Sequence, residues 1–245
     1  MMKNENRLRR LKGFIRENVK AAGKKGVVIG VSGGVDSAAC LYLAVSALGK
    51  ENCLAFHMPH DGRTMNPEVK LITNKLKVSL STYDISRIIS IFSGMTGETD
   101  PLMIGNFAAR IRSAFLYREA ASRNMLVMNT SNRSEIMTGY FTKWGDEAGD
   151  ISPFGNYYKS EVYEMASSLG VPEKILQKPP SPDFFQGQRD EEELGISYRE
   201  LDCALACDGK GEEEKADAEL LLKVRELKEK SSHKRNSPIR ALRFD

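Results

Sequence analysis

The sequence predicts an α/β protein with an open, mainly parallel sheet and helices on both faces. Residues 27–31 form a continuous β-branched run broken only by Gly30, which is typical of a strand buried on both faces. A glycine turn and an apolar helical segment follow directly, and residues 53–58 form a second apolar run that stops at Pro59. Alternation of short buried strands with helix-length segments is the pattern of parallel sheets.

The other elements are predicted from hydrophobic spacing. Apolar residues three and four apart between Leu8 and Ala22 predict an amphipathic helix that ends at Gly23. The helix after the glycine turn is expected to run from Ser37 to about Leu48. We also expect strands around 78–85 and 125–128, and helices over 67–76, 101–123, 159–169 and, rich in charge, 209–230. Residues 60–100 are the hardest to interpret.

Length and composition limit the possible functions. A chain of 245 residues with 41% hydrophobic content can bury a good core, and we expect residues 1–245 to form a single domain. The net charge of +3, from 36 basic and 33 acidic residues, gives no reason to expect nucleic-acid binding. No run reaches membrane-spanning length and the charged first segment has no signal core, so neither a membrane nor export is expected. The cysteines form no C-x-x-C pair, which favours a reducing, cytoplasmic compartment: Cys40, Cys53, Cys203 and Cys207.

The segment from Ser32 to Ser37 (Ser-Gly-Gly-Val-Asp-Ser) is predicted to bind phosphate. Gly33 and Gly34 let the backbone N–H groups turn inward, and the next helix points its positive end at the same hollow. The segment lacks the lysine of the NTPase loop and the GxGxxG pattern of dinucleotide-binding folds. Asp36, in the first helical turn, can hold Mg²⁺ beside the phosphates. The alternative is a plain glycine turn with Asp36 as a helix cap.

Polar residues also follow the strand over 125–128. Ligands in open α/β sheets lie beyond the carboxyl ends of the strands, so Thr130 and Glu135 are expected near Ser32 to Ser37. Glu135 is then a second candidate metal ligand. The alternative is ordinary capping of the following helix by residues 131–134.

Three further features are candidates for binding. Arg110 lies four residues after Asn106 on a helix face and can fork onto a phosphate or a carboxylate, unless it is simply solvated. Lys159 can neutralise a phosphate if it faces inward, and is otherwise a surface lysine. Residues 139–153 are too rich in glycine for a helix and too aromatic for a linker, so we expect them to bind a ligand. His57 and His60 lack a third ligand at a suitable spacing, so a metal site there is not favoured.

Taken together, these motifs carry a resemblance to a known family. Ser32 to Ser37 resembles the pyrophosphate loop of the ATP-pyrophosphatases, whose members cleave ATP to AMP and pyrophosphate. The wider series resembles the ammonia-dependent NAD synthetases. Its parts are Gly-Asn-x-x-Ala-Arg-x-Arg at 105–112, Thr-x-Asn-Arg-x-Glu at 130–135, Gly-Tyr-Phe-Thr-Lys-x-Gly-Asp at 139–146, Asp150, Tyr-Lys at 158–159, Lys-Pro-Pro-Ser at 178–181 and Gly-x-Ser-Tyr-x-x-Leu-Asp at 195–202.

The resemblance implies an adenine nucleotide alpha hydrolase-like fold, a homodimer and a set of site residues. The residues implied for ATP are Gly30, Val31, Ser32, Gly33, Gly34, Val35, Asp36, Ser37, Thr130, Lys159 and Ser181. Asp36 and Glu135 are implied for Mg²⁺. The positions implied for deamido-NAD are Arg110, Lys143, Asp150, His233 and Lys234. Residues 60–92 match the family poorly, so no ATP contact is assigned there.

The implied reaction is amidation of deamido-NAD to NAD with ATP, through an acyl adenylate that ammonia resolves. Asp36 and Lys159 are the expected catalytic residues for adenylation, and Asp150 is expected to position ammonia or remove its proton. Glutamine use needs a glutaminase domain, for which the flanking segments are too short. The alternatives are another amidating or thiolating ATP-pyrophosphatase and an ATP-binding sensor without turnover.

Overall fold

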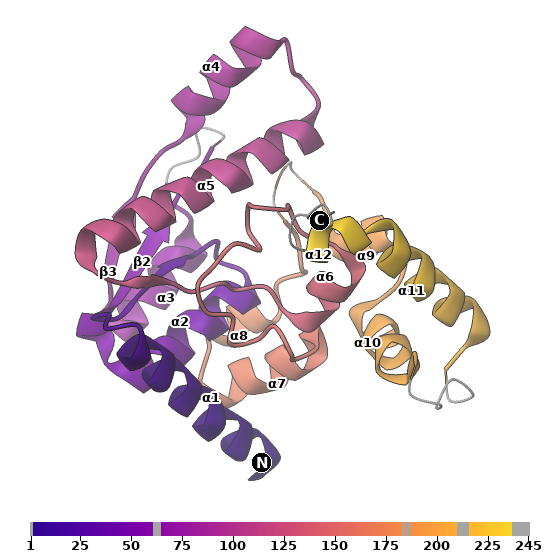
Figure 1. The fold of residues 1–245 in the computed structure, drawn as a ribbon, viewed down its shortest axis with the longest axis horizontal. Helices are drawn as coiled ribbons and strands as arrows, with labels where there is room; N and C mark the ends of the chain where they lie inside the picture. Colours follow the sequence, from indigo (N-terminus) through magenta and orange to yellow (C-terminus); the bar gives the residue numbers. More distant parts are fainter. Residues whose placement is uncertain (1, 61–64, 183, 185–186, 210–215, 237–245) are drawn as a thin grey trace, which may run out of the picture.

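The fold is built on a four-stranded parallel sheet in the order β3-β2-β1-β4 (Figure 1). The structure is a computed structural model that describes residues 2–60, 65–182, 184, 187–209 and 216–236. The strands are β1 (Val27–Gly30), β2 (Cys53–His57), β3 (Ser79–Thr82) and β4 (Leu126–Val127). Val27 lies opposite Cys53 on one side and Leu126 on the other. The predicted fold class is therefore confirmed.

Helices cover the sheet on both faces. Their bounds are α1 (Met2–Ala21), α2 (Val35–Leu48), the 3-10 turn η1 (Lys50–Asn52), α3 (Pro67–Leu76), α4 (Ser86–Thr96), α5 (Pro101–Arg123), α6 (Arg133–Thr138), α7 (Lys159–Ser168), α8 (Glu173–Leu176), α9 (Asp190–Leu194), α10 (Tyr198–Cys207), α11 (Ala218–Lys230) and α12 (Ser232–Arg235). Helices α1, α2, α3 and α7 pack with Val27 and Ile29 on one face. Helices α4 and α5 pack with Val28 and Val127 on the other. The β-branched run of β1 is thus buried from both sides.

A third hydrophobic cluster joins α10 and α11 to α6 beyond the edge of the sheet (Figure 1). Leu201 and Val224 are fully buried within it. This cluster places α12 beside the segment that follows α6, because Lys234 Nζ donates to the carbonyl oxygens of Gly139 (2.8 Å) and Phe141 (2.9 Å). The C-terminal helices therefore contribute to the region around residues 139–146.

Most element predictions are confirmed and some bounds were wrong. Helices α3 and α5 have the predicted bounds, while β3 and β4 are shorter than predicted and α2 begins at Val35 instead of Ser37. The terminal charged helix begins at Ala218, and residues 210–215 of its predicted range lie outside the described residues. Helix α10 was not predicted, although Ser197 and Glu200 form a capping box at its start.

The structure also bears on the expectations about membrane-spanning segments and cysteines. Within the described ranges, no helix has both the length and the apolar character that crossing a membrane requires. The four cysteines are free thiols; three are buried and Cys203 is exposed. The expectation of a single domain over residues 1–245 stays a prediction.

Candidate active site

A cleft of about 970 Å³ opens at the carboxyl ends of the strands. The segment after β1 lines it together with residues that follow β2 and β4, as expected where parallel strands end. Residues 178–182, between α8 and α9, form another part of the wall. Eleven of the twelve residues predicted for ATP or Mg²⁺ line the cleft: Gly30, Val31, Ser32, Gly34, Val35, Asp36, Ser37, Thr130, Glu135, Lys159 and Ser181. The twelfth, Gly33, lies within the same loop.

The backbone of the glycine loop forms hydrogen bonds with two serine hydroxyl groups of the same loop, those of Ser32 and Ser37. Gly34 N donates to Ser32 Oγ (3.2 Å), and Ser37 Oγ donates to the Gly34 carbonyl oxygen (3.1 Å). Gly33 has a φ of +89°, a conformation that favours glycine. Gly34 occupies the cap position of α2, and among the described residues no side chain caps this helix, so Asp36 is not the cap of the alternative interpretation. The backbone N–H groups in the first turn of α2 and the positive end of this helix suit a phosphate.

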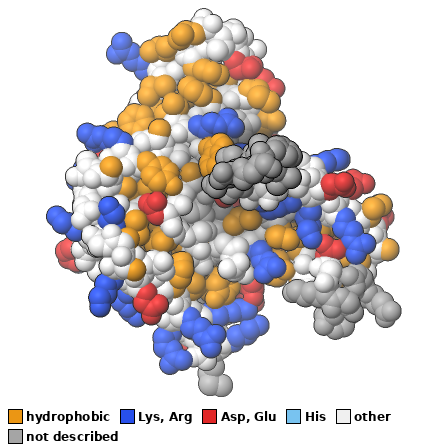
Figure 2. Space-filling model, in the orientation of Figure 1, with side chains coloured by type: hydrophobic (Ala, Val, Ile, Leu, Met, Phe, Trp, Pro, Cys, Tyr) orange, Lys and Arg blue, Asp and Glu red, His pale blue; other side chains and the backbone are white. Residues whose placement is uncertain are grey.

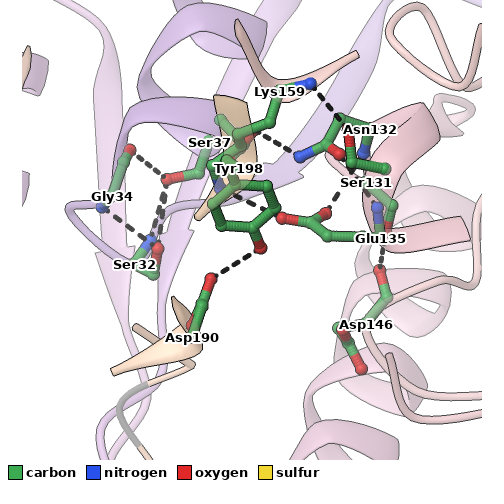
Figure 3. Close-up of polar contacts among 12 residues, drawn as sticks. Ser32, Gly34, Ser37, Ser131, Asn132, Glu135, Asp146, Lys159, Asp190 and Tyr198 are labelled. Carbon is green, nitrogen blue, oxygen red and sulfur yellow. Dashed lines mark hydrogen bonds and ion pairs between the residues drawn. The ribbon is translucent and has the colours of Figure 1, made fainter. Parts of the chain in front are cut away.

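Lys159 joins the two carboxylates that the sequence singled out, Asp36 and Glu135. Figure 3 shows Lys159 near Glu135 and Asn132. The Lys159 side chain is 3% exposed, and Nζ lies 2.6 Å from Asp36 Oδ2 and 3.1 Å from Glu135 Oε1. The remaining oxygens are bonded by Asn132, which caps α6: its Nδ2 donates to Asp36 Oδ1 (2.9 Å) and its backbone N donates to Glu135 Oε2 (3.2 Å). Capping of α6 and convergence of Glu135 on the loop therefore occur together.

Burial and charge set the protonation of this cluster. Burial would lower the pKa of Lys159, but the charges of Asp36 and Glu135 outweigh it and raise the pKa above its ordinary value. Lys159 is therefore a cation. Burial raises the pKa of Glu135; Lys159 opposes the rise and the charge of Asp36 adds to it. The net effect raises the pKa of Glu135 to about 7, so one ammonium faces two carboxyl groups of which Glu135 is partly protonated near neutral pH.

Asp36 and Glu135 fit a Mg²⁺ ion that also binds substrate phosphates. Their side chains are 17% and 16% exposed, and both line the cleft. Mg²⁺ commonly takes one or two carboxylates and completes its shell with phosphate oxygens and water. Across the described residues, no group of three or more His, Cys, Asp or Glu side chains is placed to hold a metal, so a purely protein-bound ion does not fit. His57 Nδ1 lies 3.1 Å from the Val31 carbonyl oxygen, and His60 Nδ1 lies 2.9 Å from Arg112 Nη2.

The residues predicted for deamido-NAD do not line this cleft. Four of them form a separate group that joins α5, residues 139–146 and α12, which we call the basic cluster: Arg110, Lys143, His233 and Lys234. Within it, Arg110 Nε donates to the Lys143 carbonyl oxygen (3.2 Å), and Lys143 Nζ donates to the His233 carbonyl oxygen. A second hollow of about 300 Å³ includes Trp144.

Asp150 is in neither group. Its side chain accepts a hydrogen bond from the backbone N of Val127 (2.7 Å), at the end of β4. The structure therefore does not bring Asp150 into the cleft with Asp36 and Lys159, and its proposed handling of ammonia stays a prediction.

Several site residues were not predicted individually. Asn132 carried a usable signal, since Asn followed three residues later by Glu is a capping pattern. Tyr198 lies in the Gly-x-Ser-Tyr-x-x-Leu-Asp series at 195–202, which supported the resemblance but gave this residue no role. Asp190 carried no signal, because only the packing of α9 brings it to the cleft. Lys159 Nζ lies 4.9 Å from the centre of the Tyr198 ring. Asp202 connects α10 to this region: it bonds Ser134 Oγ and accepts from Ser160 N (2.8 Å).

Comparison with known proteins agrees with this geometry. A sequence model of the NAD synthase family matches residues 7–238. The chain is 43% identical over 240 residues to an NH(3)-dependent NAD(+) synthetase of Archaeoglobus fulgidus, covering 97% of this chain and 96% of the relative. It is 45% identical over 241 residues to one of Pyrococcus horikoshii, covering 95% and 92%.

Two solved structures share the fold along their whole length. An NMN synthetase from Francisella tularensis superposes with a TM-score of 0.88 at 31% identity, covering 97% of this chain and 98% of that one. An NH3-dependent NAD synthetase from Campylobacter jejuni, in complex with the nitrate ion, gives 0.85 at 31% identity, covering 98% and 99%.

A parallel sheet whose first strand leads into a phosphate-binding glycine loop, with a cleft across the strand ends, defines an α/β enzyme of the adenine nucleotide alpha hydrolase type. The NAD synthase family model matches nearly the whole length of this chain. The chain belongs to the NAD synthase family, and it is a ligase.

Proposed function

We propose that this chain makes NAD by amidating deamido-NAD, with ATP and ammonia as co-substrates and with AMP and pyrophosphate as by-products. The observation that carries the proposal is the buried Lys159 between Asp36 and Glu135, beside the glycine loop. Inward N–H groups, a lysine and two carboxylates suit a metal-bound triphosphate. Membership of the NAD synthase family favours the dinucleotide as the second substrate.

The first step activates the nicotinate carboxylate, which is a poor electrophile until it carries a leaving group. Its oxygen attacks the α-phosphate of ATP, an acyl adenylate forms, and pyrophosphate leaves along residues 32–37. The N–H groups in the first turn of α2 and the positive end of that helix stabilise negative charge on the departing phosphates. Lys159 serves the same purpose because the neighbouring carboxylates keep it cationic.

In the second step, ammonia attacks the acyl carbon, AMP leaves as the C–O bond breaks, and the attacking nitrogen loses one proton to become the amide. Mg²⁺ held by Asp36 and Glu135 would supply further charge compensation for the phosphates when bound. Residues 139–153 are irregular, and Gly145 and Asp146 line the cleft. We assign this segment the role of excluding water, which would otherwise hydrolyse the adenylate.

Deamido-NAD is proposed to contact Asp150 and the basic cluster, and a second copy of the chain is proposed to complete this region. Large apolar side chains are exposed on α4 and the first turns of α5, and hydrophobic side chains gather there in Figure 2. They are Ile91, Met95, Leu102 and Met103. A surface of this kind on the helix that carries Arg110 supports a homodimer.

Ammonia, not glutamine, is the proposed nitrogen donor, and the cytoplasm is the proposed compartment. The curated relatives are named as NH(3)-dependent enzymes. Three of the four cysteines are buried, and burial raises the pKa of Cys40 and of Cys53, which disfavours a nucleophilic thiolate at either position. Free thiols also fit a reducing compartment.

The test is product formation by the purified chain. ATP, Mg²⁺, deamido-NAD and an ammonium salt are expected to give NAD and pyrophosphate in equal amounts. Parallel reactions replace ammonium with glutamine, or deamido-NAD with nicotinate mononucleotide. Tight ATP binding without pyrophosphate release would instead indicate a sensor. Preferential amidation of the mononucleotide would show that the substrate assignment is wrong.

A further inference from the structure

Asp202, on α10, is a buried carboxylate that the reaction described above does not use. It is 6% exposed and is not among the described residues that line the cleft. Its Oδ1 accepts a hydrogen bond from the Ser134 hydroxyl, and its Oδ2 accepts one from the backbone N of Ser160 (2.8 Å). A buried carboxylate is costly unless it has such donors. Asp202 and its two donors therefore form one unit that joins α10 to α6 and α7.

The hydrogen bonds of this unit lie at the first turn of α7. Lys159 and Ser160 are the first two residues of that helix, and N–H groups in this position have no acceptor within the helix. Ser134 Oγ, 25 positions from Lys159, accepts from Lys159 N (2.9 Å), and Asp202, 42 positions from Ser160, accepts from Ser160 N. The negative charge of Asp202 also interacts favourably with the positive end of α7. The start of α7 is therefore capped by side chains of two other helices.

Lys159 is held at both of its ends by the same part of α6. Its backbone N donates to Ser134, and its Nζ lies 3.1 Å from Oε1 of the adjacent residue, Glu135. The lysine side chain is flexible, so the place that Nζ reaches depends on where the backbone is fixed. When phosphates compete with Asp36 and Glu135 for the ammonium group, the hydrogen bonds at the backbone take no part in that competition. Misplacement of a reacting group by about 1 Å can lower a rate by about 10²-fold.

We propose that Asp202 is a positioning residue for adenylation: together with Ser134, it fixes the start of α7 and so the point from which Lys159 reaches the phosphates. This assignment rests on the proposed function. Asp202 acts through Lys159 and is not itself a catalytic residue. A separate contact attaches α10 to the rest of the chain, since Leu201 and Leu205 are buried in the cluster that α10 forms with α6 and α11. Loss of the Asp202 charge is therefore expected to disturb α7 more than the packing of α10.

The test compares catalysis with ligand binding. Asp202→Asn keeps the size of the side chain, but an amide has one accepting oxygen, so one of the two hydrogen bonds to α6 and α7 is lost. Exchange of labelled pyrophosphate into ATP, driven by saturating deamido-NAD without ammonium, is expected to fall roughly tenfold. The affinity for ATP, measured by titration calorimetry without deamido-NAD, is expected to stay within about twofold of the parent. The rate falls alone because Lys159 stabilises charge that develops on the departing phosphates.

Two further variants serve as the control and as a second test. Glu229→Gln removes an exposed carboxylate from α11, which packs against α10, and is expected to change neither quantity. Ser134→Ala removes the acceptor of Lys159 N and one donor to Asp202, so it is expected to reproduce the effect of Asp202→Asn even if that variant does not fold. An unchanged exchange rate contradicts the proposal. An equal fall of the exchange rate and the ATP affinity contradicts it too, because Asp202 would then serve folding or ATP binding.

A double-mutant cycle identifies the residue through which Asp202 acts. Lys159→Met removes the ammonium group that Asp36 and Glu135 contact, so the position of its backbone no longer matters for the phosphates. In that background, Asp202→Asn is expected to lower the remaining exchange by no more than about twofold, because effects that act through one group are not additive. A fall by the same factor in both backgrounds contradicts the proposal. If the parent shows no exchange that depends on deamido-NAD, the proposed function fails and not merely this role.

Discussion

The cluster around Lys159 and the basic cluster around Arg110 differ in how completely one chain builds them. Lys159 is 3% exposed, and its ammonium and both carboxylate partners are joined by hydrogen bonds within the chain. Arg110 is exposed, and the basic cluster is held mainly through backbone carbonyl oxygens. Leu102 and Met103, exposed apolar residues, lie on the same helix as Arg110.

This difference indicates that the two clusters have different functions: the Lys159 cluster is proposed to stabilise phosphates and the basic cluster to bind the dinucleotide. A buried, internally paired cluster is preorganised, so its charges stabilise phosphates without rearrangement during the reaction. An exposed cluster beside apolar surface suits a ligand that binds where two copies of the chain meet. The ATP half of the site is therefore expected to tolerate loss of the dimer, and the dinucleotide half is not.

Asp36→Asn should produce the largest effect on catalysis. The substitution keeps the volume of the side chain and removes a charge that contacts Lys159 and lines the cleft. We expect deamido-NAD-dependent pyrophosphate exchange to fall about 10²–10³-fold while the fold is kept. Glu51→Gln, an exposed change on η1, is the control. Turnover near that of the parent, with unchanged Mg²⁺ dependence, would remove Asp36 from the site.

Arg110→Ala tests the separation of the two regions with a smaller effect. We expect the affinity for deamido-NAD to fall on the order of tenfold, because a charged hydrogen-bond donor is lost, while the affinity for ATP hardly changes. Titration calorimetry with each ligand measures this, and Arg16→Ala on α1 is the matched control. Equal losses for the two ligands would show that Arg110 belongs to the ATP cleft.

Glu135→Gln should show a smaller, pH-dependent effect on stability. Burial raises the pKa of Glu135 in the folded chain, so between the unfolded and folded pKa values the folded state binds more protons. The resulting stability is complete below the unfolded pKa and is lost as pH rises through the folded pKa. Glutamine does not titrate, so the variant is expected to lack this loss. Urea unfolding at acidic and neutral pH measures it; parallel pH profiles for parent and variant would contradict the assignment.

The parts of the fold that were predicted carry local signals. Strand β1 has a continuous run of β-branched residues, which is typical of a strand buried on both faces of a parallel sheet. Helix α5 begins at Pro101 after the capping Asp100 and ends before Asn124, which adopts a left-handed conformation, so both of its ends are encoded nearby. The loop residues and Asp36 were predicted to lie together for the same reason, since they are consecutive in the sequence, and all of them except Gly33 line the cleft.

The rest of the site depends on contacts between distant segments. Lys159 meets Asp36 across 123 positions, and spacing alone could not distinguish it from a surface lysine. Asp190 reaches the cleft, and Tyr198 reaches Lys159, only through packing of α9 and α10 against the rest of the chain. Asp150 illustrates the opposite case: the resemblance implied a role for it, and its carboxylate accepts a hydrogen bond from the backbone of Val127, so its handling of ammonia stays a prediction.

The most direct test of the central claim is ligand binding by a chain that cannot dimerise. Leu102 and Met103 are 45% and 48% exposed, and Leu102→Lys combined with Met103→Lys places two charges on that surface. Leu222→Lys, at a residue of α11 that is 60% exposed, is the control. In a double variant shown by light scattering to be monomeric, we predict an ATP affinity within about twofold of the parent and a loss of deamido-NAD affinity of at least about tenfold. If the monomeric variant keeps both affinities, or loses both to the same extent, the claim that only dinucleotide binding depends on the dimer is contradicted.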